Sequence, residues 1–352
     1  MIPRELKKKL MKKNGISLSE YIDFCLYDKS HGYYENISRI GHDFTTSPEV
    51  SQLFGECISI FFLYLSNINL FQDLNRIAEF GPGNGTLISD IIRSLNSYNK
   101  FNKINISLFE KSKNLIKHQK QNLSNLINPN VEITWLNKIE SLDKNSHFIV
   151  CNELFDAFPI NQYIVRNNKL YERRVVYKNK KLLFEEYPTS SKLLNKITEL
   201  KDGDIIEHSC EIEKLISQIF NHLRLYGGAF LLFDYGPYQK ANVSTIQAIF
   251  KKKKCCIFEH PSRADITHHI NFVRLKEISK EYNLFSIGPI PQSKFLNMFG
   301  INERLDSILK GLSSNKIKKK LESEFFRLTS QAEMGELFKC MIFTSKQIKL
   351  LI

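Results

Sequence analysis

Long hydrophobic runs are missing from this chain of 352 residues. The longest one, from Ile58 to Leu65, is far shorter than the roughly 18 residues that a membrane span needs, so we expect a buried helix there and no membrane span. A signal peptide is missing as well, because the Lys-rich residues 1–13 lead into polar sequence. We therefore expect a soluble protein that is not exported.

Cysteine patterns that bind metal are also missing. The seven cysteines are an odd number, and none stands in a CxxC pair or in a Cys/His cluster with the spacing of zinc ligands. We expect the adjacent Cys255 and Cys256 to be two reduced thiols. The sequence therefore predicts no metal site and a reducing compartment.

Positive charge is in excess, with 50 Lys and Arg against 37 Asp and Glu and a net charge of +13. The lysines form scattered clusters at residues 7–9, 12–13, 251–254 and 318–320. Nucleic-acid binding favours an Arg-rich stripe with interleaved aromatic residues, and the sequence has none. We expect no nucleic-acid partner, and a content of 42% apolar residues predicts an ordinary globular core.

From about residue 76, short apolar runs alternate with helical stretches, which is typical of a parallel α/β sheet. The predicted strands span residues 76–80, 104–109, 131–136, 147–151 and 227–233. We expect three consecutive parts: a helical cover at 1–75, a core at 76–240 and a C-terminal part at 241–352 with the final strands. An insertion at about 160–205 carries β-type runs broken by Asn-Asn-Lys and Lys-Asn-Lys, which predicts a hairpin or meander.

The strongest local signal is the segment Glu79-Phe-Gly81-Pro-Gly83-Asn-Gly85-Thr86, between a predicted strand and a predicted helix. Glycines at such a turn let the backbone approach a ligand closely and adopt positive φ angles. The spacing is not that of the dinucleotide fingerprint, whose third glycine would fall at Thr86. The turn therefore predicts a ligand without a pyrophosphate, although a tight turn that binds nothing could have the same composition.

A second element is Glu110, which ends the second predicted strand, 25 residues after Gly85. An acidic side chain at this place can accept both hydrogen bonds from a ribose diol. A lone glutamate at a strand end is usually solvated. Together with the glycine turn, however, it predicts an adenosine-containing cofactor at the carboxyl ends of the strands.

Glu79, the glycine turn and Glu110 match the cofactor site of class I methyltransferases. Residues 41–56, GHDFTTSPEVSQLFGE, resemble the GDFxTSPExSQxFGE signature of the MidA-like methyltransferases. That family includes a mitochondrial complex I assembly factor described as a protein arginine methyltransferase. Further matches run from about residue 15 to 343, as EFGPGNGTLISD (79–90), NELFDAFPI (152–160), FDYG (233–236), ADITHHINF (264–272) and MGELFK (334–339). Two departures are His42, where glycine is usual, and Asn271, where the family has aspartate.

The resemblance implies a class I methyltransferase fold, which is a Rossmann-like α/β sheet, with a helical cover and a β-rich insertion after the fourth strand. It implies S-adenosyl-L-methionine as the cofactor. It also implies arginine N-methylation of a protein, giving symmetric dimethylarginine on a subunit of respiratory complex I. The residues that we expect to bind the cofactor are Thr46, Ser47, Glu79, Gly81, Gly83, Gly85, Thr86 and Glu110.

An arginine acceptor is a planar cation, so carboxylates are needed to hold its guanidinium and to take its proton. Glu153 and Asp156 follow the fourth predicted strand, and we expect them to be these catalytic acids. The alternative is that Glu153 only braces the turn before Pro159. The expected substrate-binding residues are Glu49, Asp234, Tyr235, Asp265 and His268. Ser47-Pro48-Glu49 would also make a good helix start.

Two other functions stay open at this point. The chain could be a non-catalytic, cofactor-binding assembly chaperone, or a methyltransferase for a small molecule or RNA. A nucleotide-dependent oxidoreductase is disfavoured by the glycine spacing. We expect a bacterial cytoplasmic protein, with the mitochondrial matrix as the alternative.

Overall fold

The computed structural model describes residues 2–36, 45–68, 71, 73–98, 101–189, 201–239 and 242–350. The chain divides into two compact units that are interleaved along the sequence. Unit 1 comprises Met1–Ile37, Phe155–Leu215 and Gln239–His269, and unit 2 comprises Ser38–Leu154, Ile216–Tyr238 and Ile270–Ile352. These units differ from the three consecutive parts expected from the sequence. The reason is that the N-terminal helices share a hydrophobic core with the insertion, through residues such as Leu18 and Val175.

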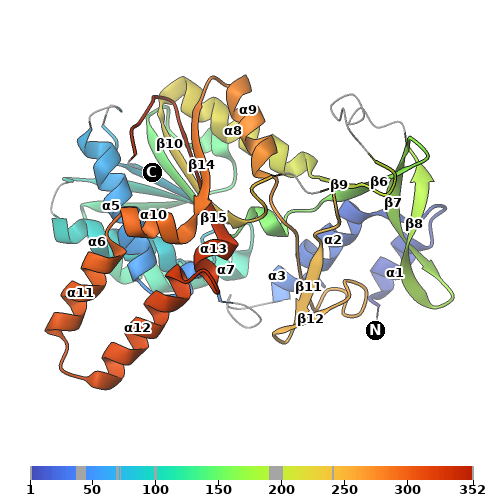
Figure 1. The fold of residues 1–352 in the computed structure, drawn as a ribbon, viewed down its shortest axis with the longest axis horizontal. Coiled ribbons are helices and arrows are strands. Elements are labelled where there is room, and N and C mark those ends of the chain that lie inside the picture. The colour runs from blue at the N-terminus through green and yellow to red at the C-terminus, as the bar shows by residue number, and fades with distance from the viewer. Residues whose placement is uncertain are drawn as a thin grey trace. The chain divides into compact units, whose positions relative to one another are not determined.

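Unit 2 is built on a seven-stranded sheet with the order β14-β15-β10-β5-β2-β3-β4. Figure 1 labels β14, β15 and β10, which lie side by side in this sheet. The strands are β2 (Arg76–Phe80), β3 (Ile104–Phe109), β4 (Val131–Leu136), β5 (His147–Asn152), β10 (Gly228–Tyr235), β14 (Phe285–Pro291) and β15 (Phe338–Thr344). β15 is antiparallel to both of its neighbours, and the pairs from β10 to β4 are parallel. All five strands predicted from the sequence are present.

The order of the strands reverses between β2 and β5. From β2 the chain continues outward to β3 and β4, and it then returns to place β5 on the other side of β2. Ligands of open α/β sheets bind at such a reversal, outside the carboxyl ends of the strands. The fold therefore directs attention to the residues that follow Phe80 and Cys151, which are paired across these two strands.

Helices cover both faces of this sheet. They are α5 (Leu53–Asn67), α6 (Thr86–Tyr98), α7 (Lys113–Leu123), the unit 2 part of α8 (Cys210–Tyr226), α9 (Phe272–Glu281), α10 (Gln292–Met298), α11 (Ile301–Gly311) and α12 (Asn315–Thr329). On one face Phe61 of α5 contacts Phe148, and on the other Phe220 of α8 contacts Phe343. The apolar run from Ile58 to Leu65 lies in α5, as expected. In the part of the chain that the structure describes, no helix is long and apolar enough to cross a membrane.

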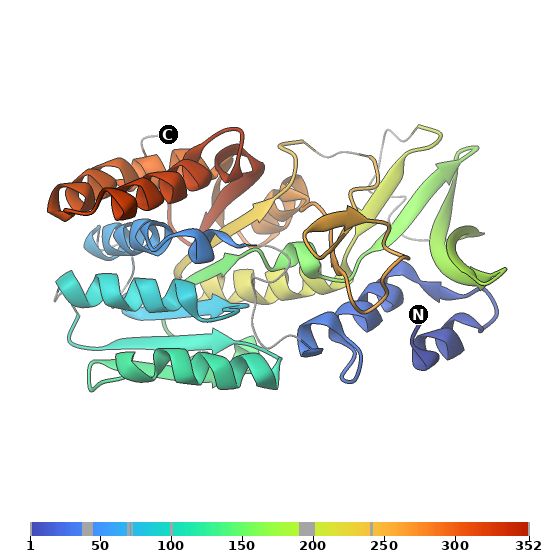
Figure 2. The same cartoon turned by 90° about the horizontal axis from the view of Figure 1, so that it is seen from below.

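The C-terminal helices α11 and α12 run side by side as a hairpin (Figure 2). Asn271, which departs from the family pattern, is the N-cap of α9, and its side chain accepts a hydrogen bond from the backbone N–H of Arg274 at 3.0 Å. An asparagine does this as well as an aspartate. His42, the other departure, lies outside the described residues.

Unit 1 combines helices with two small antiparallel sheets. Its elements are α1 (Arg4–Leu10), β1 (Ile16–Ser17), α2 (Leu18–Tyr27), α3 (Tyr33–Asn36), β6 (Asn161–Arg166), β7 (Lys169–Lys178), β8 (Lys181–Pro188), β9 (Ile205–His208), β11 (Gln247–Phe250), β12 (Lys253–Cys255) and β13 (Asp265–Thr267). The two-residue turns Asn167-Asn168 and Asn179-Lys180 have positive φ at both positions, as tight hairpins require. The meander predicted for the insertion is confirmed.

Candidate active site

The glycine turn follows β2 and leads into α6. Gly81, Gly83 and Gly85 have φ angles of 67°, 54° and 77°, in the left-handed region that favours glycine. The N–H of Gly81 donates to the carbonyl of Phe109 at 3.0 Å, which ties the turn to β3. A Cβ atom on Gly81 would lie 2.8 Å from a methyl carbon of Leu154. The turn therefore needs glycine for its backbone shape, and a side chain at Gly81 would also displace the end of Leu154.

Helix α7 holds this turn from one side. The side-chain amide of Gln119 donates to the carbonyl of Gly83 at 2.8 Å and to the carboxylate of Glu110 at 3.3 Å. Its oxygen accepts the indole N–H of Trp135 at 2.8 Å. Asn122 donates to the carbonyl of Asn84 at 3.0 Å. Gln119 is completely buried and links the turn to the acid that ends β3.

Glu110 is fixed by the backbone as well. Its Oε1 accepts hydrogen bonds from the N–H groups of Lys111 and Ser112, at 2.8 and 2.9 Å. The side chain of Ser112 in turn caps the first turn of α7. Glu110 is thus oriented before any ligand arrives, as a ribose-binding carboxylate should be.

Two buried acceptors at the strand reversal have no hydrogen-bond partner. They are Oε2 of Glu79 and Oδ1 of Asn152. Glu79 is paired with Val150 across β2 and β5, so Asn152 lies two residues further along β5, on the same face of the sheet. Burial raises the pKa of Glu79 to about 8, and the nearby Asp90 and Glu110 add to the rise. Buried acceptors without partners are costly, so the site suits a ligand that brings donors or positive charge.

A short helix before α5 braces the other side of the turn. In α4 (Ser47–Val50), the carboxylate of Glu49 accepts hydrogen bonds from the side chains of Asn84, at 3.0 Å, and of Thr86, at 2.5 Å. Ser47 is fully buried and donates to Gln292 at 2.9 Å. Thr46 is the N-cap of α4, without a side-chain capping bond. Contacts of Thr46 and Ser47 with cofactor, and of Glu49 with substrate, stay predictions.

Glu153 follows β5 in a strained backbone conformation, with a φ of 49°. Its Oε1 accepts hydrogen bonds from the N–H of Ser47 at 3.0 Å and from the side chain of Asn152 at 3.1 Å. Glu153 therefore links α4 to the end of β5, and its catalytic role stays a prediction. Asp234 is fully buried at the end of β10, where its carboxylate accepts the N–H of Tyr235 at 2.9 Å.

Comparison with known proteins decides which family this site belongs to. Residues 63–290 match the family described as "Putative S-adenosyl-L-methionine-dependent methyltransferase". The chain belongs to this family. The protein is therefore a methyltransferase with S-adenosylmethionine as its cofactor.

Curated relatives and solved structures agree with the family. The mitochondrial protein arginine methyltransferase NDUFAF7 of Bos taurus is 27% identical and aligns with 98% of this chain and 83% of its own length. The homolog in Caenorhabditis elegans is also 27% identical, over 99% of this chain and 88% of its own length. Two crystal structures from Burkholderia thailandensis share the fold, each covering 95% of this chain and 89% of its own, with TM-scores of 0.81 and 0.79 at 23% and 22% identity. The second has S-adenosyl-homocysteine bound.

The residues of this methyltransferase fit its cofactor. The glycine turn would let its backbone approach the cofactor, Glu110 would accept hydrogen bonds from a ribose diol, and the open acceptors of Glu79 and Asn152 would suit a cationic group of the ligand. The cofactor supplies a methyl group on a sulfonium, and transfer of that group is an in-line displacement. The chain's own share is to align donor and acceptor and to exclude water.

The remaining predicted site residues belong to unit 1. Asp156, Asp265 and His268 are all buried, and the N–H of His268 donates to the carbonyl of Asp156 at 2.9 Å. The hydroxyl of Tyr34 donates to the carboxylate of Asp265 at 3.0 Å. Burial raises the pKa of Tyr34, and both aspartates add to the rise, so the three acidic groups are neighbours. Substrate contact by Asp156, Asp265 and His268 stays a prediction, as it does for Asp234 and Tyr235 of unit 2.

The ring of His268 is held on both sides. Its two nitrogens face the carbonyl oxygens of Phe158 and His269, at 3.0 and 3.1 Å. Burial lowers the pKa of His268, although the two carbonyls favour the imidazolium. A neutral ring can donate to one of these oxygens only. Among the described residues no group of His, Cys, Asp and Glu could hold a metal ion.

The sequence did not single out Gln119, Asn152 or Tyr34. A signal for Gln119 was available, because Leu115, Gln119 and Leu123 follow one another at intervals of four on the predicted helix. A polar residue in such an apolar stripe must be buried with partners. Nothing local distinguishes Tyr34, whose partner Asp265 lies 231 residues away.

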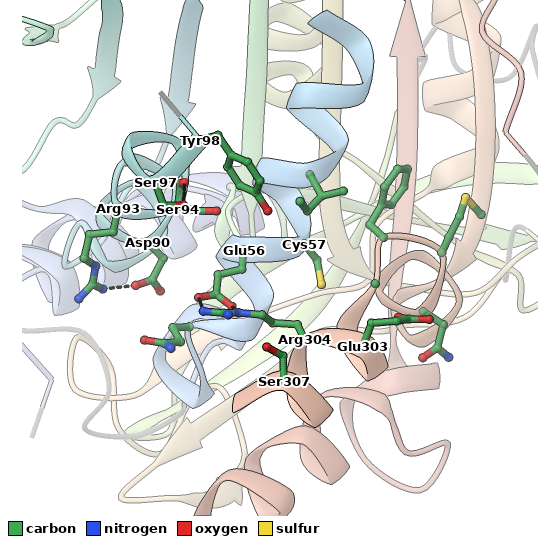
Figure 3. A pocket seen from close by; sticks show the side chains of 16 residues that line it. Glu56, Cys57, Asp90, Arg93, Ser94, Ser97, Tyr98, Glu303, Arg304 and Ser307 are labelled. Atoms are coloured by element: carbon green, nitrogen blue, oxygen red, sulfur yellow. Dashed lines mark hydrogen bonds and ion pairs between the residues drawn. The ribbon is translucent and has the colours of Figure 1, made fainter. Parts of the chain in front are cut away.

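A separate hollow of about 780 Å³ lies between α5, α6 and the start of α11 (Figure 3). Glu56 and Arg304 form a bidentate ion pair in it, at 2.8 and 3.0 Å, and Asp90 pairs with Arg93. Burial raises the pKa of Asp90 to about 6. None of the predicted site residues lines this hollow, so we do not assign methyl transfer to it.

Proposed function

We propose that this methyltransferase methylates arginine side chains of a protein and forms symmetric dimethylarginine. We further propose that its substrate is a subunit of respiratory complex I. The observation that carries the proposal is that relatives named as protein arginine methyltransferases align with 98% and 99% of this chain. The resemblance of the TSPExSQ signature to the MidA-like family supports the link to complex I.

Glu153 and Asp156 are the acids that we assign to the guanidinium. Because this group stays charged at any ordinary pH, its binding needs carboxylates and its reaction needs an acceptor for one proton. The strained backbone of Glu153 supports a functional role, since such strain gathers at active sites. Support for Asp156 comes from its burial, because a buried carboxylate favours a cationic partner. Glu49, Asp234, Tyr235, Asp265 and His268 are proposed to line the path of the substrate.

The compartment that we propose is a bacterial cytoplasm. The relatives named above are mitochondrial proteins, which supports the mitochondrial matrix as the alternative.

The experiment is methyl transfer from labelled S-adenosylmethionine to purified complex I subunits, followed by amino-acid analysis. We expect label in symmetric dimethylarginine. The Glu153→Gln variant keeps an acceptor for the N–H of Ser47 but loses its charge, so it should bind cofactor normally and transfer methyl about 100-fold more slowly. Glu132→Gln is the matched control, because Glu132 of β4 is exposed and forms a surface ion pair with Lys103 at 2.7 Å.

Three outcomes would contradict the proposal. Label in asymmetric or monomethyl arginine alone would exclude symmetric dimethylation. Label in RNA or in a small molecule would show that this molecule, and not a protein arginine, is the methyl acceptor. Normal cofactor binding without any transfer, together with complex I assembly that survives Glu153→Gln, would indicate a non-catalytic assembly chaperone.

A further inference from the structure

A cysteine outside the methyl-transfer site lies beside a histidine and a glutamate in unit 1. Cys210 is the first residue of α8, separated from the end of β9 by Ser209, and its side chain is exposed. Ser209 caps the helix, with its side chain accepting the N–H of Ile212 at 3.2 Å.

An imidazole faces this sulfur. Nδ1 of His208 lies 3.8 Å from Sγ of Cys210, within hydrogen-bonding distance for sulfur. Nε2 of the same ring lies 3.5 Å from the carboxylate of Glu213, one turn into α8. This is the order of nucleophile, base and orienting carboxylate that activates a side chain for covalent chemistry. Glu211, also in the first turn of α8, is a second carboxylate at this end of the helix.

The other cysteines have different surroundings. Four of the seven are buried, at positions 25, 57, 151 and 340. Cys255 is half-buried, and burial raises its pKa, with Glu259 adding to the rise. Cys256 is exposed like Cys210, and the acidic group at its backbone N–H is Glu259, at 3.2 Å. Cys256 is therefore a natural reference for an exposed thiol.

We propose that Cys210 is a reactive thiol that peroxide oxidises to a sulfenic acid, with His208 holding its proton. The thiol gives its proton to Nδ1 of His208, and the sulfur attacks one oxygen of hydrogen peroxide. An S–O bond forms and the O–O bond breaks, so that sulfur loses two electrons to the peroxide. The departing hydroxide takes the proton from His208 and leaves as water. Glu213 orients the ring and stabilises its charged form.

The test is trapping of sulfenic acid in the full-length protein, in a Cys255→Ser background. This background is needed because the thiol next to Cys256 would otherwise consume a sulfenic acid formed there. The protein is treated with hydrogen peroxide and dimedone, and the adducts at Cys210 and Cys256 are measured by mass spectrometry. We expect Cys210 to be labelled about ten times faster than Cys256.

Variants separate activation from exposure. His208→Gln should bring the ratio of the two rates to about one, and Glu213→Gln should lower it by about threefold. Both adducts are measured in the same molecule. A general loosening of unit 1 would bring the ratio of the two rates nearer to one by faster labelling at Cys256, whereas loss of activation would do so by slower labelling at Cys210. Equal labelling in the parent protein, or an unchanged ratio in His208→Gln, would overturn the proposal.

Discussion

Two polar clusters, one around Glu79 in unit 2 and one around Glu207 in unit 1, differ in what satisfies their hydrogen bonds. In unit 2, Glu79 and Asn152 each keep a buried acceptor atom without a partner at the reversal of the strand order. In unit 1, the carboxylate of Glu207 accepts hydrogen bonds from the side chain of Gln162 at 2.7 Å and from both the N–H, at 3.0 Å, and the hydroxyl of Thr245. The hydroxyl of Thr245 then accepts the N–H of His269 at 2.9 Å.

This contrast distinguishes a binding site from a structural network. Acceptors left open in a buried place have a free-energy cost that a ligand can remove, whereas a carboxylate surrounded by donors of its own chain has no such need. We therefore expect substitutions around Glu79 to change cofactor affinity. Substitutions around Glu207 should change the stability of unit 1 instead.

The largest effect should come from Gly81→Val. A valine at a φ of 67° is strained by about 1–3 kcal/mol, and its side chain would also collide with Leu154, so we expect the Kd for S-adenosyl-homocysteine to rise at least ~100-fold. Calorimetric titration measures this change.

The matched control for Gly81→Val is Gly203→Val in unit 1. Gly203 also has a positive φ, of 89°, and a Cβ atom there would meet nothing within 4 Å. This variant should bind cofactor normally, in spite of similar backbone strain. Equal losses of affinity in the two variants would mean that the glycine turn is not the binding site.

The open acceptor of Glu79 predicts that binding depends on pH. With a pKa of about 8 in the free protein, Glu79 is mostly protonated at pH 7. A cationic ligand group next to Oε2 favours the carboxylate, so binding should release a proton, and affinity should rise by up to about tenfold per pH unit between pH 6 and 7.5.

Titrations of the cofactor in two buffers of different ionisation enthalpy measure the released proton directly. Glu79→Gln should remove both the proton release and the pH slope, while any titration of the ligand itself stays the same in both proteins. A slope that persists in Glu79→Gln would show that another group releases the proton.

How much of the fold could be predicted from the sequence can be judged from the strands and the turn around Glu79. The strands β2, β3 and β4 have the predicted limits, because buried parallel strands are continuous apolar runs and such runs have clear ends. The glycine turn and the family were also identifiable, since positive φ angles require glycine at fixed places. The insertion's turns were marked by asparagines, which tolerate the left-handed region.

The division into two units and the partners of the site residues were not predictable in this way. Glu49 was expected to bind substrate and lies against Asn84 and Thr86, and Glu153 accepts a hydrogen bond from a residue 106 positions earlier. Such contacts depend on how distant segments pack, which no local pattern encodes. An unpartnered atom, such as Oδ1 of Asn152, is a property of the finished fold alone.

A smaller effect is expected from Gln119→Leu. The change removes the amide that joins Gly83 to Glu110 and leaves the indole N–H of Trp135 without its acceptor, so we expect the Kd for cofactor to rise about tenfold. Trp135 is the single tryptophan of the chain, and its fluorescence can follow the titration.

Gln121→Leu is the matched control for Gln119→Leu. Gln121 lies on the same helix with an exposed side chain, and its substitution should leave the Kd unchanged. If Gln119→Leu bound cofactor as tightly as this control, the link from α7 to the glycine turn would have no role in binding.

Glu207→Gln should have the smallest effect on cofactor binding. It tests the second cluster of the comparison, the network around Glu207. Glutamine keeps one acceptor oxygen but places an NH₂ group where Glu207 accepts from Gln162 or Thr245, so two donors would face each other in a half-buried place. We expect a loss of about 1–2 kcal/mol in the free energy of unfolding, measured by urea denaturation, and no change in the Kd for cofactor.

Because the hydroxyl of Thr245 also accepts the N–H of His269, faster hydrogen exchange at the amide of His269 should accompany this loss of stability. A change in cofactor affinity similar to that of Gln119→Leu would remove the distinction between the closed network around Glu207 and the open site around Glu79.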